Sequence, residues 1–194
     1  MQRRQLNLRA AAVLAALATF GSLAAAPAWA EKVKLATSMG DIVLELDAAK
    51  APKTVDNFLK YVAAGQYDGT VFHRVIDGFM VQGGGMTPDM KEKATRAPIA
   101  LESGNGLANV RGSVAMARTG VPDSATAQFF INLVDNTRLD ASMPGQNGYA
   151  VFGKVVSGME VVDKIRTVAV ADNGPHQNVP VKPVLITKAS VLPK

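Results

Sequence analysis

The stretch VFHRVIDGFMVQGGG, residues 71–85, is the segment around which the fold is expected to form. Two apolar runs lie on either side of Ile76-Asp77-Gly78, and an Asp-Gly pair in that position strongly favours a β-hairpin. The hairpin carries Arg74 and Gln82 among apolar neighbours, and residues of these types are rarely buried in a core. The polar pair therefore indicates either a functional site or an arginine at a sheet edge that pairs with a surface carboxylate.

The register of the hairpin decides which side chains share a face. A three-residue loop with Gly78 left-handed predicts that Arg74 opposes Met80 and that Phe72 opposes Gln82. Those four side chains would then lie on one face, with the arginine above an apolar floor. A two-residue loop would place Gln82 on the face opposite to Arg74.

Residues 1–30 have the three-part layout of a secretory signal peptide. Three arginines lie within the first nine residues, an apolar run follows at 10–26, and residues 28–30 read Ala-Trp-Ala, a small-x-small cleavage pattern. Cleavage would fall before Glu31 and leave a periplasmic domain of residues 31–194. The alternative is an uncleaved membrane anchor. No other stretch approaches the ~20 apolar residues of a bilayer span, so we expect no stable membrane association after cleavage.

Composition limits the classes of function that the chain can serve. The formal net charge is +5, but three arginines leave with the leader, and the remaining 18 basic and 16 acidic residues give +2. That balance offers no electrostatic attraction for nucleic acid. The chain has no cysteine and therefore no disulfide framework, and the 164 residues after the leader can bury a full core without one.

Short apolar runs separated by glycine turns predict a mainly β domain of about eight strands. Helical spacing appears at 52–64 and again after Ser157-Gly158. We expect a closed antiparallel barrel or a sandwich, with the two helices over its open ends. The expected strands cover residues 33–37, 42–46, 71–75, 79–85, 113–117, 128–133, 149–156 and 181–192, and residues 137–148 are expected to be irregular.

The sequence gives little support for metal, nucleotide or nucleophilic chemistry. Neither His73 nor His176 has a partner at metal-ligand spacing, and His73 is expected on the strand face opposite to Arg74. No serine lies in a G-x-S-x-G context, so an exported hydrolase would lack a recognisable nucleophile. The run GNGLAN at 104–109 begins like a dinucleotide fingerprint but lacks the third glycine and a βαβ unit. We expect no cofactor and no metal.

Four motifs, in order, give the chain a resemblance to a known family. They are VFHRVIDGFMVQGG from residue 71, RGSVAMAR at 111–118, SATAQFFI at 124–131 and YAVFGKV at 149–155. Together they resemble a cyclophilin-type peptidyl-prolyl cis-trans isomerase, and the likeness covers residues 31–194. The exported, cysteine-free form is similar to the periplasmic bacterial cyclophilins. The resemblance implies a mainly β fold, a closed eight-stranded antiparallel barrel capped by two α-helices.

The resemblance also implies which residues form the site. Arg74 matches the catalytic arginine, and Gln82 matches the glutamine that supports the arginine and the substrate. Many eukaryotic members carry tryptophan where Arg138 stands and histidine where Tyr149 stands, which affects the expected binding of the family's inhibitor, cyclosporin A. The implied substrate-binding positions are Phe79, Met80, Met116, Ala117, Arg118, Phe130, Leu139 and Tyr149, of which Phe79, Met80, Phe130 and Leu139 match the proline pocket.

These residue types suit a reaction that needs no nucleophile. Rotation about an X-Pro amide is slow because conjugation is lost across a barrier of ~18–20 kcal/mol. An apolar pocket can hold the proline ring while Arg74 donates a hydrogen bond toward the nitrogen that pyramidalises. The expected partners are proline-containing unfolded or partly folded polypeptides, and the enzyme is expected to be a monomer. The alternative is a periplasmic peptide-binding or chaperone module with incidental catalysis.

Overall fold

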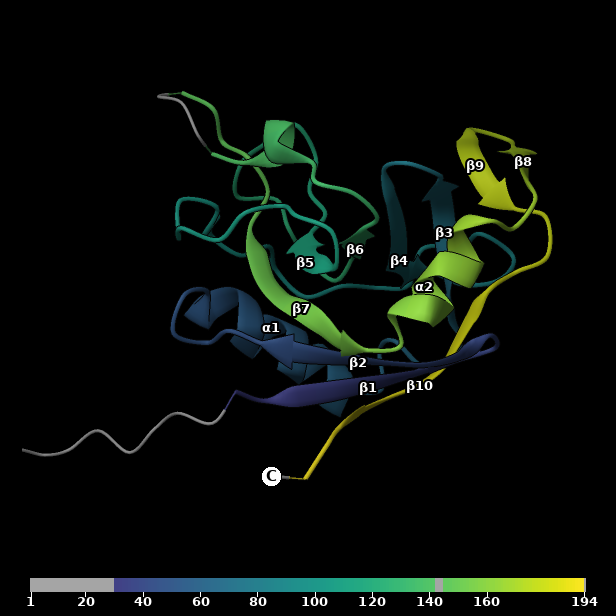
Figure 1. The fold of residues 1–194 in the computed structure, drawn as a ribbon, viewed down its shortest axis with the longest axis horizontal. Coiled ribbons are helices and arrows are strands. Elements are labelled where there is room, and N and C mark those ends of the chain that lie inside the picture. The colour runs from purple at the N-terminus through teal and green to yellow at the C-terminus, as the bar shows by residue number, and fades with distance from the viewer. Residues whose placement is uncertain (1–29, 142–144, 194) are drawn as a thin grey trace, which may run out of the picture.

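Eight antiparallel strands close into a barrel. A computed structural model describes residues 30–141 and 145–193, so residues 1–29 of the expected signal peptide lie outside the described residues. The barrel strands are β1 (Lys32–Thr37), β2 (Gly40–Leu46), β3 (Thr70–Ile76), β4 (Met80–Met86), β5 (Ser113–Met116), β6 (Phe129–Asn132), β7 (Val151–Ser157) and β10 (Leu185–Val191). Their order around the barrel is β1-β10-β3-β4-β6-β5-β7-β2 (Figure 1). The expected mainly β fold is confirmed, as a closed barrel and not a sandwich.

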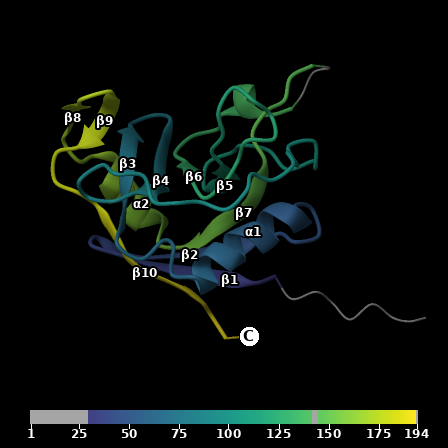
Figure 2. The same ribbon diagram turned by 180° about the vertical axis from the view of Figure 1, so that it is seen from behind.

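Two helices cover the openings of the barrel. Helix α1 (Pro52–Ala63) begins at a proline, whose missing N–H and fixed φ suit a first turn, and buries Phe58 in the main core. Helix α2 (Met159–Arg166) buries Val162 in the same core. Figure 2, turned by 180° from Figure 1, brings α1 to the front, so the two helices lie on opposite sides of the barrel. Among the described residues, no helix has the length and apolar character needed to cross a membrane.

Side-chain alternation sorts the apolar residues of the barrel wall into two clusters. Val81, Val114 and Ile131 belong to the main core, which the closed barrel surrounds. Their neighbours along the strands point to the other face of the wall. We call that second group the outer apolar cluster; it consists of Met80, Ala115, Phe130 and Val151, with Ile76, Phe79, Leu107, Ala117, Leu139 and Tyr149 packed against them.

The central hairpin has a three-residue loop, but the loop lies one residue further along than predicted. Ile76 pairs with Met80 and Arg74 pairs with Gln82. Arg74, Met80 and Gln82 therefore share a face, as predicted. The placement of Phe72 on that face was wrong, because a β-bulge between Phe72 and Arg74 adds a residue to β3 and returns Phe72 to the main core.

A small two-stranded sheet and a short 3-10 turn are not part of the barrel. Strands β8 (Val170–Asn173) and β9 (His176–Pro180) form a separate two-stranded sheet, drawn in yellow beside β3 in Figures 1 and 2. This hairpin was not predicted from the sequence, because its residues are mostly polar and exposed and show no apolar alternation. A single 3-10 turn, η1 (Thr137–Leu139), lies within the segment that was expected to be irregular.

Candidate functional site

A transverse row on the outer face of the barrel carries the residues that the hairpin motif predicted. Strand pairing sets Arg74 opposite Gln82 and Gln82 opposite Phe130. The row continues as Phe130 opposite Ala115 and Ala115 opposite Val151. Because paired residues of neighbouring strands point to the same side of a sheet, a guanidinium, an amide and an apolar surface lie next to one another.

The outer apolar cluster brings together most of the predicted substrate-binding positions. The rings of Phe130 and Tyr149 meet edge to face with centroids 5.6 Å apart. Met116 is not in this cluster, because it alternates inward and is buried in the main core. Arg118 is treated separately below. The predicted positions within the cluster are Phe79, Met80, Ala117, Phe130, Leu139 and Tyr149.

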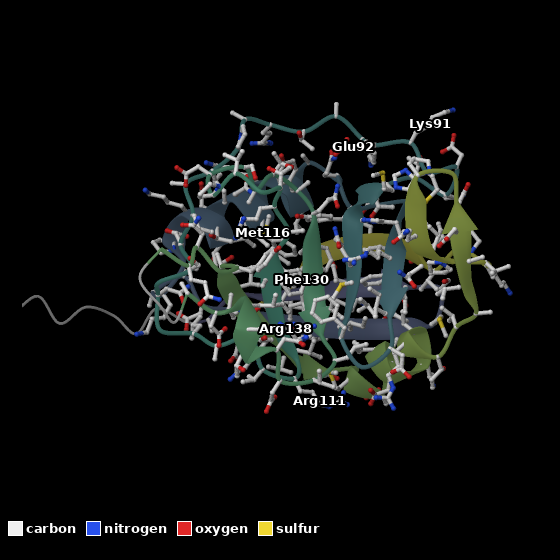
Figure 3. All side chains as sticks on the ribbon, turned by 90° about the horizontal axis from the view of Figure 1, so that it is seen from above. Lys91, Glu92, Arg111, Met116, Phe130 and Arg138 are labelled. Atoms are coloured by element: carbon white, nitrogen blue, oxygen red, sulfur yellow. The ribbon has the colours of Figure 1, made fainter. Side chains whose placement is uncertain are left out.

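Two arginines stack on aromatic rings of the outer apolar cluster. The Arg118 Cζ lies 4.6 Å from the centroid of the Tyr149 ring, and the Arg138 Cζ lies 4.9 Å from that of Phe79. Both distances fall within the range of cation–π attraction. Figure 3 shows Phe130 and Arg138 near the middle of this face, with Lys91 and Glu92 toward its edge. Positive charge therefore borders the apolar surface.

Gln82 is held by a second glutamine. Its Nε2 donates to Gln128 Oε1 at 2.9 Å, and Gln128 Nε2 donates in turn to Glu92 Oε1 at 3.5 Å. Within residues 30–141 and 145–193, no hydrogen bond joins the side chains of Gln82 and Arg74. The predicted site lacked Gln128, although its spacing of two from Phe130 in the QFF run places both residues on the same strand face.

A pocket of about 350 Å³ lies beside Arg74 and is bordered by the β8–β9 hairpin. His73 lines it together with Arg74, so the prediction that the two residues lie on opposite faces was wrong, because the β-bulge interrupts the alternation of β3. Burial lowers the pKa of His73 to about 4, and the neighbouring His176 contributes to the shift. His73 Nδ1 has no hydrogen-bond partner among the described residues. His73 is therefore neutral at neutral pH.

The described residues show no metal centre. No group of three or more His, Asp or Glu side chains in this part of the chain is arranged to hold a metal ion. The chemistry that the site offers is a charged donor, two amides and an apolar surface.

A buried asparagine network lies next to the outer apolar cluster. Asn132 Nδ2 donates to Asn109 Oδ1 at 3.2 Å, and Asn136 Nδ2 donates to Asn132 Oδ1 at 2.8 Å. Asn136 Nδ2 also donates to the Phe79 carbonyl at 2.9 Å, while Asn109 Nδ2 donates to Asp140 Oδ1 at 2.8 Å. The network thus links the hairpin loop to the loops on either side of η1. The network was not predicted from the sequence, because asparagines in polar stretches are also ordinary turn formers.

Known proteins resemble this chain over most of its length. The family described as cyclophilin type peptidyl-prolyl cis-trans isomerase/CLD matches residues 32–191. The chain belongs to this family. One cyclophilin relative is peptidyl-prolyl cis-trans isomerase A of Dickeya dadantii, 56% identical over 189 residues that cover 94% of this chain and 98% of that protein. Peptidyl-prolyl cis-trans isomerase B of Escherichia coli is 55% identical over 157 residues, covering 80% and 96%.

Solved cyclophilin structures share the fold. A crystal structure of a cyclophilin type isomerase of Cryptosporidium parvum matches with a TM-score of 0.71 and 26% identity, covering 86% of this chain and 99% of that chain. A structure of the same protein in the presence of the dipeptide Ala-Pro matches with a TM-score of 0.69. The predicted family, fold and enzyme class are confirmed: the chain is a cyclophilin-type peptidyl-prolyl cis-trans isomerase.

Proposed function

We propose that this cyclophilin accelerates rotation about X-Pro bonds in exported polypeptides and so assists their folding. The observation that carries the proposal is the transverse row in which Arg74, Gln82 and Phe130 lie side by side on the outer face of the barrel. The Cryptosporidium relative was crystallised in the presence of Ala-Pro, and an apolar surface beside a charged donor suits a proline ring and its amide.

The outer apolar cluster would hold the proline ring. Phe130 and Met80 form an almost fully buried floor. The partly exposed Phe79, Leu139 and Tyr149 pack against this floor and supply the apolar surface that still meets water. A proline ring placed on this surface would displace water from both partners, and apolar burial is favourable at roughly 25 cal/mol per Å². Binding of this kind fixes the ring while leaving the preceding carbonyl free to turn.

Arg74 would stabilise the twisted amide. As the peptide bond leaves planarity, the proline nitrogen regains its lone pair and becomes a hydrogen-bond acceptor. Arg74 is always charged, and its side chain makes no hydrogen bond or ion pair with other described residues. A donor of this kind in a water-poor site interacts more strongly with the transition state than with either planar isomer. Rotation needs no proton transfer, which agrees with a neutral His73.

An isomerisation assay on a short Ala-Pro peptide tests the proposal. Arg74→Ala should lose most of the activity, whereas Arg96→Ala should keep it, because Arg96 stacks on Tyr61 of α1, away from the outer apolar cluster. Equal activity of the two variants would contradict the mechanism. Peptide binding without acceleration in the unaltered protein would instead identify the chain as a peptide-binding module.

We infer that the chain acts in the periplasm as a monomer. The support for the periplasmic location is the signal-like layout of residues 1–30 and the position of β1, which begins at Lys32, so that cleavage before Glu31 would spare every barrel strand. N-terminal sequencing of exported protein should give Glu31 as the first residue. Membrane-bound material that starts at Met1 would contradict the inference, and sedimentation of the released protein measures its oligomeric state.

A further inference from the structure

Three arginines around the proposed substrate surface lack an acidic partner. Arg74, Arg118 and Arg138 form no ion pair among the described residues, and these residues include all 16 Asp and Glu of the chain. Among the other described arginines, Arg111 and Arg166 both contact Asp163, and Arg96, which stacks on Tyr61 away from this surface, has no ion pair. Three of the four unpaired arginines therefore lie around the proposed substrate surface.

The carboxylates of nearby loops are already engaged. Asp140 accepts hydrogen bonds from the backbone and side chain of Asn109 at 2.7 and 2.8 Å. Asp135 accepts from the backbone N–H of Arg111 at 2.9 Å, and Asp77 lies 3.7 Å from Arg166. Pairing any of these three carboxylates with the unpaired arginines would require breaking the contacts that they already make. A carboxylate supplied by a bound polypeptide could pair with an arginine without breaking any of them.

Arg118 is held in position before any substrate arrives. Its Nε donates to the Gly148 carbonyl at 2.9 Å and its Nη1 donates to the Thr119 carbonyl at 2.8 Å. Its Nη2 makes no hydrogen bond within the described part of the chain, while its guanidinium stacks on Tyr149. A donor fixed by its neighbours loses little side-chain entropy when it binds a carboxylate.

We infer that the enzyme prefers client segments with an aspartate or glutamate next to the proline. The inference rests on the proposed function and names its substrate class. Arg118 and Arg138 each lie within 5 Å of a ring of the outer apolar cluster. Consecutive Cα atoms are 3.8 Å apart, so a residue adjacent to a proline held there comes within reach of one guanidinium or the other. An acidic peptide fits better than nucleic acid, because the charges surround an apolar surface and the domain outside the leader carries only +2.

Matched peptides test the preference. Four proline peptides carry Glu or its neutral isostere Gln, either immediately before or immediately after the proline, and kcat/KM is measured on the full chain at low ionic strength. We expect the Glu peptide of at least one pair to react roughly 2- to 5-fold faster, the size that an exposed ion pair supports. At 1 M salt the Glu-to-Gln ratio should fall toward one, because the Debye length is then only about 3 Å.

Variants assign the effect to the arginines. Arg118→Gln or Arg138→Gln should lower the Glu-to-Gln ratio for one of the two peptide positions. Arg96→Gln is the matched control, because the Arg96 Cζ also lies over a tyrosine ring, at 5.6 Å from the centroid of Tyr61. The control should leave the ratio unchanged.

Each other outcome overturns the inference in an identifiable way. Equal rates for Glu and Gln peptides in both positions would refute the acidic preference while leaving the isomerase function intact. A preference that survives both substitutions would show that Arg118 and Arg138 do not cause it. A single-stranded oligonucleotide could instead inhibit the isomerisation of Gln and Glu peptides equally. If Arg118→Gln abolished that inhibition, the surface would be identified as a nucleic-acid surface. Failure to isomerise any of the four peptides would refute the proposed function itself.

Discussion

The guanidinium of Arg74 combines two properties, a permanent charge and a planar fork of donors. Arg74→Lys separates them, because lysine keeps the charge but loses the fork. Loss of one preorganised donor in comparable sites costs about 2.7–4 kcal/mol, or 10²- to 10³-fold in kcat. We therefore expect Arg74→Lys to recover only a small part of the activity lost in Arg74→Ala, measured as kcat in the peptide assay. Recovery to near the original rate would show that charge alone is sufficient.

His73 should make the fold, but not the reaction, sensitive to pH. An unfolded histidine takes up a proton near its pKa of ~6.5, whereas burial keeps the pKa of folded His73 at about 4. Between these values the unfolded state binds more protons, so the free energy of unfolding decreases as pH falls from about 6.5 to about 4, by at most about 3 kcal/mol. Denaturant unfolding at pH 7 and pH 5 measures the decrease, which His73→Gln should reduce.

Activity should stay nearly flat from about pH 6 to 9, since the proposed rotation transfers no proton. A clear inflection in kcat within that range would instead show that a titrating group takes part in the reaction.

Arg138 should weaken inhibition by cyclosporin A. The guanidinium covers the ring of Phe79 with Cζ at 4.9 Å, where tryptophan-bearing family members present a flat indole. Placing an apolar macrocycle there would partly desolvate an unpaired charge, which is costly. We expect weak inhibition of the unaltered protein and tighter inhibition of Arg138→Trp, titrated in one isomerase assay. Equal, tight inhibition of both would show that Arg138 does not control the drug site.

At the scale of the elements, the asparagine network should hold the loops that carry the outer apolar cluster. Asn136→Ala leaves Asn132 Oδ1 without its donor and removes one of the two donors to the Phe79 carbonyl. A buried polar group left unpaired costs about 1–3 kcal/mol, so the free energy of unfolding should fall by this amount. KM should rise at the same time because Phe79 is less firmly placed.

The matched control for that experiment is Asn173→Ala, since Asn173 is exposed in β8. It should change neither the stability nor KM. A rise in KM with unchanged stability in Asn136→Ala would contradict the idea that the network acts by holding the loops.

Some elements could be predicted from the sequence, and others could not. The hairpins, the two helices and the barrel follow from apolar spacing and turn residues, which are local signals. The bulge in β3 could not be predicted, because it depends on how β3 pairs with a partner strand and not on its own pattern. The bulge places Phe72 in the main core and lets His73 line the same pocket as Arg74. The Gln82–Gln128 bond and three of the four bonds described for the asparagine network also join residues 23 to 57 positions apart, which no local pattern encodes.

On the scale of the whole molecule, the barrel should not depend on residues 1–30. Every described strand and helix begins at or after Lys32. A chain of residues 31–194 should therefore unfold at the same temperature as the full chain and show the same kcat/KM. Thermal unfolding and the peptide assay measure both quantities, and a lower unfolding temperature would show that residues 1–30 contribute to the fold.

The two ends of the barrel sheet close on each other, since β1 pairs with β10 from Val33 opposite Val191 to Thr37 opposite Ile186. A growing chain presents β1 first and β10 last, so one edge of β1 stays unpaired until synthesis is nearly finished. Contacts between residues this far apart in sequence are also the slowest to form, because loop-closure entropy must be overcome first. Completion of synthesis, and not the appearance of the first strands, therefore sets the earliest moment at which the barrel can form, and an unfinished chain presents β1 with one edge open.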